Sequence, residues 1–312
     1  MKKLIVLTGP TSTGKTDLAI QFCKEFNGEI ISADSRQIYK GMDIGTGKAG
    51  LDDIVEKHDN WWKINDVIIH GYDLVVPMTW FSADHFRNFA MPVMQAIWKK
   101  GKLPFLVGGT WFYIKAVIDP FETIGIPPNT ELRARLERLS VDALQNELRM
   151  MNATRLTQMN HSDRHNPRRL IRAIEVASAK TPKKRLALDC RVVFFGLTAP
   201  QEELYRRINE RLDHRLRAGL VDEVNRLIED GVTHERMEEL GLEYRYVSRF
   251  LRGVISKEHM IGQLQYAIHH YAKRQLTFMK KDGRIQWFDI TDKGFCGTMK
   301  RALEGFNHDT KN

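Results

Sequence analysis

The first 120 residues alternate short apolar runs with stretches whose apolar residues recur at helical spacing. Strands are predicted at Leu4–Leu7, Glu29–Ser32 and Leu103–Val107, and helices at Thr16–Phe26, Phe81–Lys100 and Trp111–Val117. Strands that alternate with helices in this way form a parallel sheet covered by crossover helices. The pattern therefore predicts an α/β core.

A charged, arginine-rich helical segment interrupts this alternation from about Thr130 to Ala187. Pro127-Pro128 precede it, and Asn166-Pro167 break it before a helix resumes at Arg168–Ala179. The apolar run Cys190–Leu197 then predicts that the sheet continues. We therefore expect a core made of residues 1–120 and 188–312, and a helical insert domain at residues 121–187.

The C-terminal third predicts long helices and one last strand. Gln201–Glu229 is amphipathic with an interruption near Gly219, and His259–Lys281 places apolar residues on one face. Ile285–Ile290 predicts an edge strand.

Composition limits the class of protein. The chain has 312 residues, of which 42% are hydrophobic, enough for a sizeable globular core. It contains no run of about 18 apolar residues, so we expect no membrane span. The apolar run at the N-terminus is too short for a signal peptide and no small-residue cleavage site follows it, so we expect a cytoplasmic protein.

Basic residues are concentrated in two segments of a chain whose formal net charge is +9. The first contains Arg164, Arg168, Arg169, Arg172, Lys180, Lys183, Lys184 and Arg185 against Glu175 alone. The second contains Lys273, Arg274, Lys280, Lys281 and Arg284 against Asp282 alone. Such clusters are typical of proteins that bind a nucleic-acid backbone, although solvated basic faces give the same pattern.

A P-loop lies directly after the first predicted strand. Gly9-Pro10-Thr11-Ser12-Thr13-Gly14-Lys15-Thr16 matches G-x-x-x-x-G-K-[ST], with a strand before it and a helix after it. Backbone N–H groups of such a loop converge on phosphate oxygens, and the helix dipole adds positive charge. Lys15 supplies a full charge, and the Thr16 hydroxyl is placed to bind magnesium. The loop therefore predicts a P-loop core that binds a pyrophosphate or a nucleotide's phosphates.

Two further strands end in polar residues. Asp34 follows the second predicted strand, and Gly108-Gly109-Thr110 follows the third. The carboxyl ends of parallel strands open onto one ligand crevice, so we expect Asp34 and Thr110 to face the same cleft as Lys15. Asp34 there is suited to bind a metal or to act as a general base; the alternative is a turn cap.

Several segments together resemble the tRNA dimethylallyltransferase family, in order and spacing over nearly the whole chain. The matching stretches are Gly9–Thr16, Ile31–Lys48, Phe81–Phe86, Leu106–Lys115, Pro167–Glu175 and Lys273–Thr277. This family transfers a dimethylallyl group from dimethylallyl diphosphate to the exocyclic N6 of the adenosine 3′-adjacent to the anticodon, and pyrophosphate leaves. Since the chain ends without a zinc finger, it resembles the bacterial type.

The resemblance implies roles for residues of this chain. Asp34 would be the catalytic base, Thr110 would lie near the target base, and Thr16 with magnesium would hold the pyrophosphate in the P-loop. Arg207 and Arg211 would reach the same phosphates. The tRNA anticodon stem-loop would contact residues from the strand ends, the insert and the C-terminal helix: Asp34, Ser35, Arg36, Gln37, Thr110, Arg133, Arg168, Arg169, Arg172, Lys273, Arg274, Gln275 and Lys280. No protein partner is implied, and we expect a monomer.

Two segments depart from the family pattern. The family's Gly-Tyr-Lys/Arg segment is here Gly241-Leu242-Glu243-Tyr244-Arg245-Tyr246, and its His-Pro-Asn-Asp is here His161–Pro167. Both lie in the half expected to contact tRNA, so the residue contacts there are open.

Three other functions share some of these features. A nucleoside or nucleotide kinase would share the P-loop, and an adenylate isopentenyltransferase would share the donor. A non-catalytic RNA-binding protein would share the basic clusters. The block around Asp34 argues against a kinase. The insert and the basic C-terminal helix argue against a free nucleotide as the acceptor. The presence of Lys15, Thr16 and Asp34 argues against a protein that only binds RNA.

Overall fold

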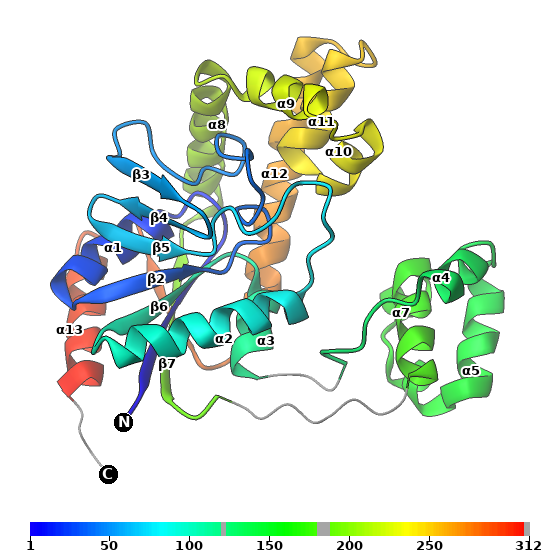
Figure 1. The fold of residues 1–312 in the computed structure, drawn as a ribbon, viewed down its shortest axis with the longest axis horizontal. Helices are drawn as coiled ribbons and strands as arrows, with labels where there is room; N and C mark the ends of the chain where they lie inside the picture. Colours follow the sequence, from blue (N-terminus) through cyan, green and yellow to red (C-terminus); the bar gives the residue numbers. More distant parts are fainter. Residues whose placement is uncertain (120–122, 180–187, 309–312) are drawn as a thin grey trace. The chain divides into compact units, whose positions relative to one another are not determined.

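The computed structural model describes residues 1–119, 123–179 and 188–308. The chain forms two compact units, one comprising Met1–Ile118 with Leu188–Asn312 and the other Asp119–Ala187 (Figure 1). Among the described residues, no helix has the length and apolar composition that crossing a lipid bilayer requires.

An eight-stranded sheet forms the centre of the first unit, in the order β3-β4-β5-β2-β6-β1-β7-β8. Its strands are β1 (Lys3–Thr8), β2 (Gly28–Ser32), β3 (Val55–His58), β4 (Trp61–Ile64), β5 (Val67–His70), β6 (Leu103–Gly108), β7 (Arg191–Thr198) and β8 (Ile285–Asp289). All neighbours from β5 to β8 are parallel. The predicted strands at the N-terminus, at 190–197 and at the C-terminal edge are thereby confirmed, as is the α/β fold.

An antiparallel extension, β3 to β5, was not predicted from the sequence. Its three strands have four residues each, and β3 is largely exposed, so none of them gives a long apolar run. The turn between β4 and β5 did carry a signal: Asn65 and Asp66 both have positive φ and join Ile64 directly to Val67. Two such residues form the tight turn that β-hairpins prefer.

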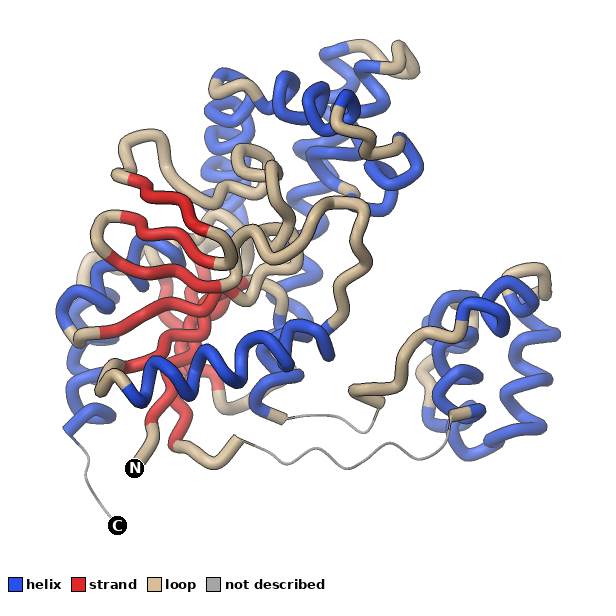
Figure 2. The backbone as a smooth tube through the Cα atoms, viewed as in Figure 1, coloured by secondary structure: helices blue, strands red, loops and turns tan. Residues whose placement is uncertain are grey.

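Helices cover both faces of the sheet (Figure 2). α1 (Lys15–Glu25) and α13 (Phe295–His308) supply Phe22 and Leu303 to one core cluster with strand residues such as Ile5. α2 (Ala83–Lys99) contributes no residue to that cluster and lies against β2 and β6. As predicted, Ser82 caps α2 and the helix continues through Pro92.

Five helices form a second core in the same unit. They are α8 (Gln201–Arg217), α9 (Leu220–Glu229), α10 (His234–Leu240), α11 (Leu242–Leu251) and α12 (Lys257–Met279). The predicted interruption near Gly219 is confirmed: this residue has φ 97° and separates α8 from α9. Ile38 and Met42, from the segment after β2, are buried in this core. The helices are therefore packed directly against the chain that leaves the second strand. A further helix of this unit, α3 (Trp111–Ile118), follows β6.

The second unit is helical, with α4 (Thr130–Leu136), α5 (Val141–Gln158), α6 (His161–Arg164) and α7 (Pro167–Ser178). Its core contains Leu144, Leu148, Leu170 and Ile174. The predicted break at Asn166-Pro167 is the start of α7, where the Asn166 side chain accepts the backbone N–H of Arg169. Lys180, Lys183, Lys184 and Arg185 of the first basic segment lie outside the described residues.

A buried carboxylate at the start of β2 bonds the end of β5 and the segment between α2 and β6. The Glu29 side chain is 1% exposed and contacts His70 at 2.8 Å, Lys102 at 3.0 Å and Lys100 at 3.1 Å. Burial raises the pKa of Glu29, but hydrogen bonds from His70, Lys102 and Lys100 outweigh burial and lower the pKa to about 2.

We predict that Glu29 makes the protein sensitive to acid. Its folded pKa lies below the unfolded value of 4.5, so its stabilisation is complete above pH 4.5 and is lost as pH falls toward 2. At roughly 1.4 kcal/mol per pKa unit, the wild type should lose about 2 kcal/mol of unfolding free energy through this group between pH 6 and pH 3. Urea unfolding of wild type and Glu29→Gln at both pH values measures this loss; equal losses in the two proteins would contradict it.

Candidate active site

The P-loop connects β1 to α1. β1 ends at Thr8 and α1 begins at Lys15, so residues 9–14 form the connecting loop. Gly14 has φ 76° directly before the helix. The N–H groups of the first turn of α1 therefore point out of the helix at Lys15 and Thr16, where phosphate oxygens bind in such loops.

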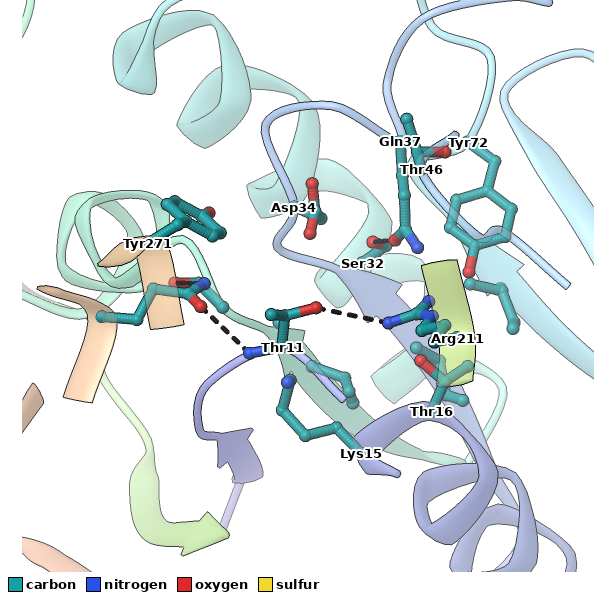
Figure 3. A pocket seen from close by; sticks show the side chains of 16 residues that line it. Thr11, Lys15, Thr16, Ser32, Asp34, Gln37, Thr46, Tyr72, Arg211 and Tyr271 are labelled. Carbon is teal, nitrogen blue, oxygen red and sulfur yellow. Dashed lines mark hydrogen bonds between the residues drawn. The ribbon is translucent and has the colours of Figure 1, made fainter. Parts of the chain in front are cut away.

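A cavity of about 80 Å³ opens at this point. Polar side chains from the P-loop, the end of β2 and two distant helices line it: Thr11, Lys15, Thr16, Ser32, Asp34, Gln37, Thr46, Arg211, Tyr271 and Gln275. In Figure 3, Asp34 lies at the top of the cavity and Lys15 and Thr16 at the bottom, with Arg211 at the side. A negatively charged group bound to the P-loop would thus lie across the cavity from the Asp34 carboxylate.

The cations of the cavity are partly buried and hydrogen-bonded. The Lys15 ammonium donates to the Pro10 carbonyl at 2.7 Å, and Arg211 donates to the Thr11 hydroxyl at 3.3 Å. Burial and, to a smaller extent, repulsion by Arg211 lower the pKa of Lys15 to about 7, although Asp34 opposes both. Repulsion by Arg215 and burial lower the pKa of Arg211 to about 10. A bound anion would relieve this repulsion, so the cavity is electrostatically suited to a phosphate or diphosphate.

Asp34 is fixed by the turn that follows β2. Its Oδ1 accepts the backbone N–H of Arg36 at 2.8 Å, so the carboxylate caps this turn and also lines the cavity. The Thr110 hydroxyl accepts the N–H of Ser35 at 3.0 Å and donates to the Ser35 hydroxyl at 3.3 Å. Thr110 itself does not line the cavity; its hydrogen bonds hold the end of β6 against the residue next to Asp34.

Comparison with known proteins identifies the family. The IPP transferase family model matches residues 37–282, a range that begins after the P-loop. The chain belongs to this family. It is 40% identical to "tRNA dimethylallyltransferase 2" of Syntrophotalea carbinolica, over 92% of this chain and 94% of the relative. It is 36% identical to the tRNA dimethylallyltransferase of Thermomicrobium roseum, over 97% of this chain and 91% of the relative.

Solved structures agree with the family. The full-length tRNA isopentenylpyrophosphate transferase of Bacillus halodurans is similar with TM-score 0.71 and 32% identity, covering 98% of this chain and 96% of that one. A eukaryotic dimethylallyltransferase, captured acting on tRNA, is similar with TM-score 0.79 and 26% identity. The match covers 98% of this chain and 79% of that protein. The fold of this IPP transferase is therefore shared across its whole length.

Of the two arginines expected at the phosphates, Arg211 lines the cavity and Arg207 does not. Arg207 pairs with Glu203, one turn earlier in α8, at 2.6 Å. Both arginines lie on the same face of α8, so the sequence alone did not distinguish them.

Two residues expected to bind tRNA are instead part of the cavity wall. Gln275 of α12 accepts the N–H of Thr11 at 3.0 Å and donates to the Gly109 carbonyl at 3.0 Å. Gln37 donates to the Gly47 carbonyl at 3.2 Å and contacts the Ser32 hydroxyl at 2.7 Å. Both are 8% exposed, so their hydrogen bonds organise the cavity.

The other residues of this group lie at the surface of the first unit. Lys273, Arg274 and Lys280 are exposed on α12 or at its end. Arg36 and Ser35 are half-buried beside Asp34, and Arg36 donates to the Glu239 carbonyl at 3.3 Å. These side chains are available to a large anionic partner.

In the helical insert, the expected arginines divide into two pairs. Arg133 and Arg172 both bond the buried carboxylate of Glu175, at 2.7 Å and 3.1 Å, and Arg172 also donates to the Ile126 carbonyl at 2.8 Å. Arg168 and Arg169 are exposed, and Arg169 pairs with Asp163. Arg133 and Arg172 thus hold the insert together, whereas Arg168 and Arg169 form its basic surface.

Several residues of the cavity give no signal in the sequence. Thr46 lies in the glycine-rich segment after β2, where only the glycines gave a signal. Tyr271 and Tyr72 carried no motif, because long-range packing brings them to the P-loop.

We predict that anion binding weakens as pH rises above 7. The free protein's Lys15 loses its proton near that pH because its pKa is about 7, and a bound diphosphate favours the charged form, so affinity should fall by up to about tenfold per pH unit. Calorimetry with inorganic pyrophosphate between pH 6.5 and 8.5 measures the decline. Since pyrophosphate itself titrates, Lys15→Arg, whose charge persists, is the control; identical pH profiles would contradict the role of Lys15.

Proposed function

We propose that this IPP transferase moves the dimethylallyl group of dimethylallyl diphosphate to the N6 of the adenosine 3′-adjacent to the anticodon of a tRNA. The observation that carries the proposal is one cavity with partly buried cations at the P-loop and the Asp34 carboxylate opposite them. Family membership supplies the class of reaction. We also propose that the protein acts in the cytoplasm as a monomer.

The reaction needs two charges of opposite sign on either side of the transferred carbon. The allylic C–O bond breaks, and its electron pair leaves with pyrophosphate, which Lys15 and Arg211 would stabilise. A new bond forms between the allylic carbon and N6, and Asp34 would take the proton that N6 releases. Support for these roles comes from the position of Asp34 across the cavity from Lys15.

Magnesium fits the donor set of the P-loop. The Thr16 hydroxyl lines the cavity next to Lys15, and Mg²⁺ usually binds one or two protein oxygens together with substrate phosphates and water. Bound there, Mg²⁺ would neutralise charge on the pyrophosphate. Thr16 is the residue that we propose as its protein ligand.

The acceptor adenosine must leave its stack to reach a cavity of this size. Bases of an RNA loop unstack at lower cost than bases in a duplex, which favours the anticodon loop. The exposed lysine and arginine residues on α12 would contact its phosphates.

Mass spectrometry of tRNA incubated with the protein and dimethylallyl diphosphate tests the function. We expect a dimethylallyl adduct on the adenosine next to the anticodon and release of pyrophosphate. Incubation with AMP in place of tRNA tests a free-nucleotide acceptor, and incubation with ATP and nucleosides tests a kinase. Phosphorylated nucleoside without a tRNA adduct would refute the proposal.

Removing the carboxylate should abolish transfer and leave tRNA binding largely intact. General bases contribute roughly 100- to 10,000-fold, so Asp34→Ala and Asp34→Asn should lower the single-turnover rate by at least about 100-fold. Asn keeps an oxygen for the Arg36 N–H and therefore separates loss of the base from loss of the turn. Wild-type turnover in Asp34→Asn would rule out the general-base role.

The exposed arginines of the insert should bind tRNA through its phosphates. We expect Arg168→Ala with Arg169→Ala to weaken tRNA binding and to flatten the plot of log K against log salt by about 1.5, from two phosphate contacts. Arg135→Ala is the control, because Arg135 is also an exposed, ion-paired arginine of this unit. An unchanged salt slope in the double variant would show that these residues do not face RNA.

A further inference from the structure

A glycine-rich loop after β2 forms one wall of the cavity. Thr46 lines the cavity, and the carbonyl of Gly47 accepts hydrogen bonds from Gln37 at 3.2 Å and Arg211 at 3.5 Å. At the far end of this loop, Lys48 is fully buried between Asp43 and Asp73, at 2.7 and 2.5 Å. The loop therefore has a fixed end at Lys48, and its Gly47 carbonyl and the Thr11 hydroxyl both accept hydrogen bonds from Arg211.

A carboxylate from another element holds the other end of the loop. Glu223, in the first turn of α9, accepts the backbone N–H groups of Asp43 at 2.8 Å, Ile44 at 2.6 Å and Gly45 at 2.9 Å. Three successive N–H groups form a concavity that binds an anion, and here the anion is internal. Glu223 is 3% exposed, so water does not replace it.

Tyr244 of α11 holds Glu223 in turn. Its hydroxyl donates to Glu223 Oε1 at 2.9 Å, and its ring is 1% exposed. A Cβ on Gly45 would lie 2.6 Å from the Tyr244 hydroxyl oxygen. The loop backbone therefore lies directly against this tyrosine, and only glycine fits at position 45.

A second residue of α11, Glu243, bonds an arginine of α8 that lies against Gly47. Glu243 pairs with Arg215 at 2.6 Å, and both side chains are nearly buried. A Cβ on Gly47 would clash with a guanidinium nitrogen of Arg211 and with one of Arg215, so both groups lie against this glycine. Glu243 neutralises the second guanidinium and allows Arg211 to remain beside it.

We propose that Glu223, held by Tyr244, is a positioning residue of the donor site. It fixes the loop at residues 43–47 so that Thr46 and Arg211 face the diphosphate, and it affects binding of the donor rather than of tRNA. The inference rests on the proposed function, in which that diphosphate is the donor's. It also gives a role to Gly241–Tyr246, the segment that departs from the family pattern. Tyr244 of this segment bonds Glu223, and its Glu243 bonds Arg215, which lies beside Arg211.

The test compares donor and acceptor parameters in Glu223→Gln and Tyr244→Phe. In Glu223→Gln, an amide N–H replaces one of the two acceptor oxygens and faces a backbone N–H or the tyrosine hydroxyl, which are also donors. We therefore expect the Kd for inorganic pyrophosphate and the KM for dimethylallyl diphosphate to rise about tenfold. Tyr244→Phe removes one hydrogen bond and should raise both about threefold. The KM for tRNA should change less than about twofold.

Glu229→Gln is the matched control, since Glu229 is exposed on the same helix and bonds only to Asn225 among the described residues. Wild-type pyrophosphate affinity in both Glu223→Gln and Tyr244→Phe would overturn the proposal, as would equal losses for tRNA and donor that follow the melting temperature. Lys15→Ala tests the proposed function separately from the role of Glu223. If this variant binds pyrophosphate like the wild type, the P-loop does not hold the diphosphate, and the proposed function itself is contradicted.

Discussion

Two partly buried cations that repel each other are the constraint on which the active site depends. Lys15 and Arg211 reach the same cavity from α1 and α8, elements far apart along the chain. Burial and repulsion by neighbouring cations lower the pKa of both. Such an arrangement costs folding free energy in the free protein and is relieved by an anionic ligand. The site is thus organised for its ligand at the expense of its own stability.

Carboxylates around the cavity limit this cost without filling the site. Asp34 faces the cations from across the cavity and favours the charged form of both. Glu243 compensates Arg215, the residue whose repulsion most affects Arg211. Glu243 lies beside Arg215 and Asp34 lies across the cavity, so the space between the P-loop and Asp34 is left for substrate.

The elements that a local pattern specifies were predictable, and those specified by distant contacts were not. The P-loop and the strand before Asp34 have runs and motifs that fix their structure, and the parallel order of the sheet brings their ends together. The four-residue strands β3 to β5 lack such runs. The contact of Glu223 with residues 43–45 joins segments that no spacing relates, so only the folded chain reveals it. Likewise, Arg133 and Arg172 belong to an arginine-rich surface by sequence, and the buried Glu175 turns both inward.

The helix α12 connects the P-loop to the surface of the protein. This helix touches the P-loop through Gln275, and within the same turn it exposes Lys273 and Arg274. A helix is stiff over such a distance, so a force on its outer side is transmitted to the N–H of Thr11. If RNA on the outer face shifts the helix toward the loop, the first substrate to bind changes the affinity for the second, and thermodynamic reciprocity makes that change equal in both directions. The coupling between the two substrates is then a property of one helix.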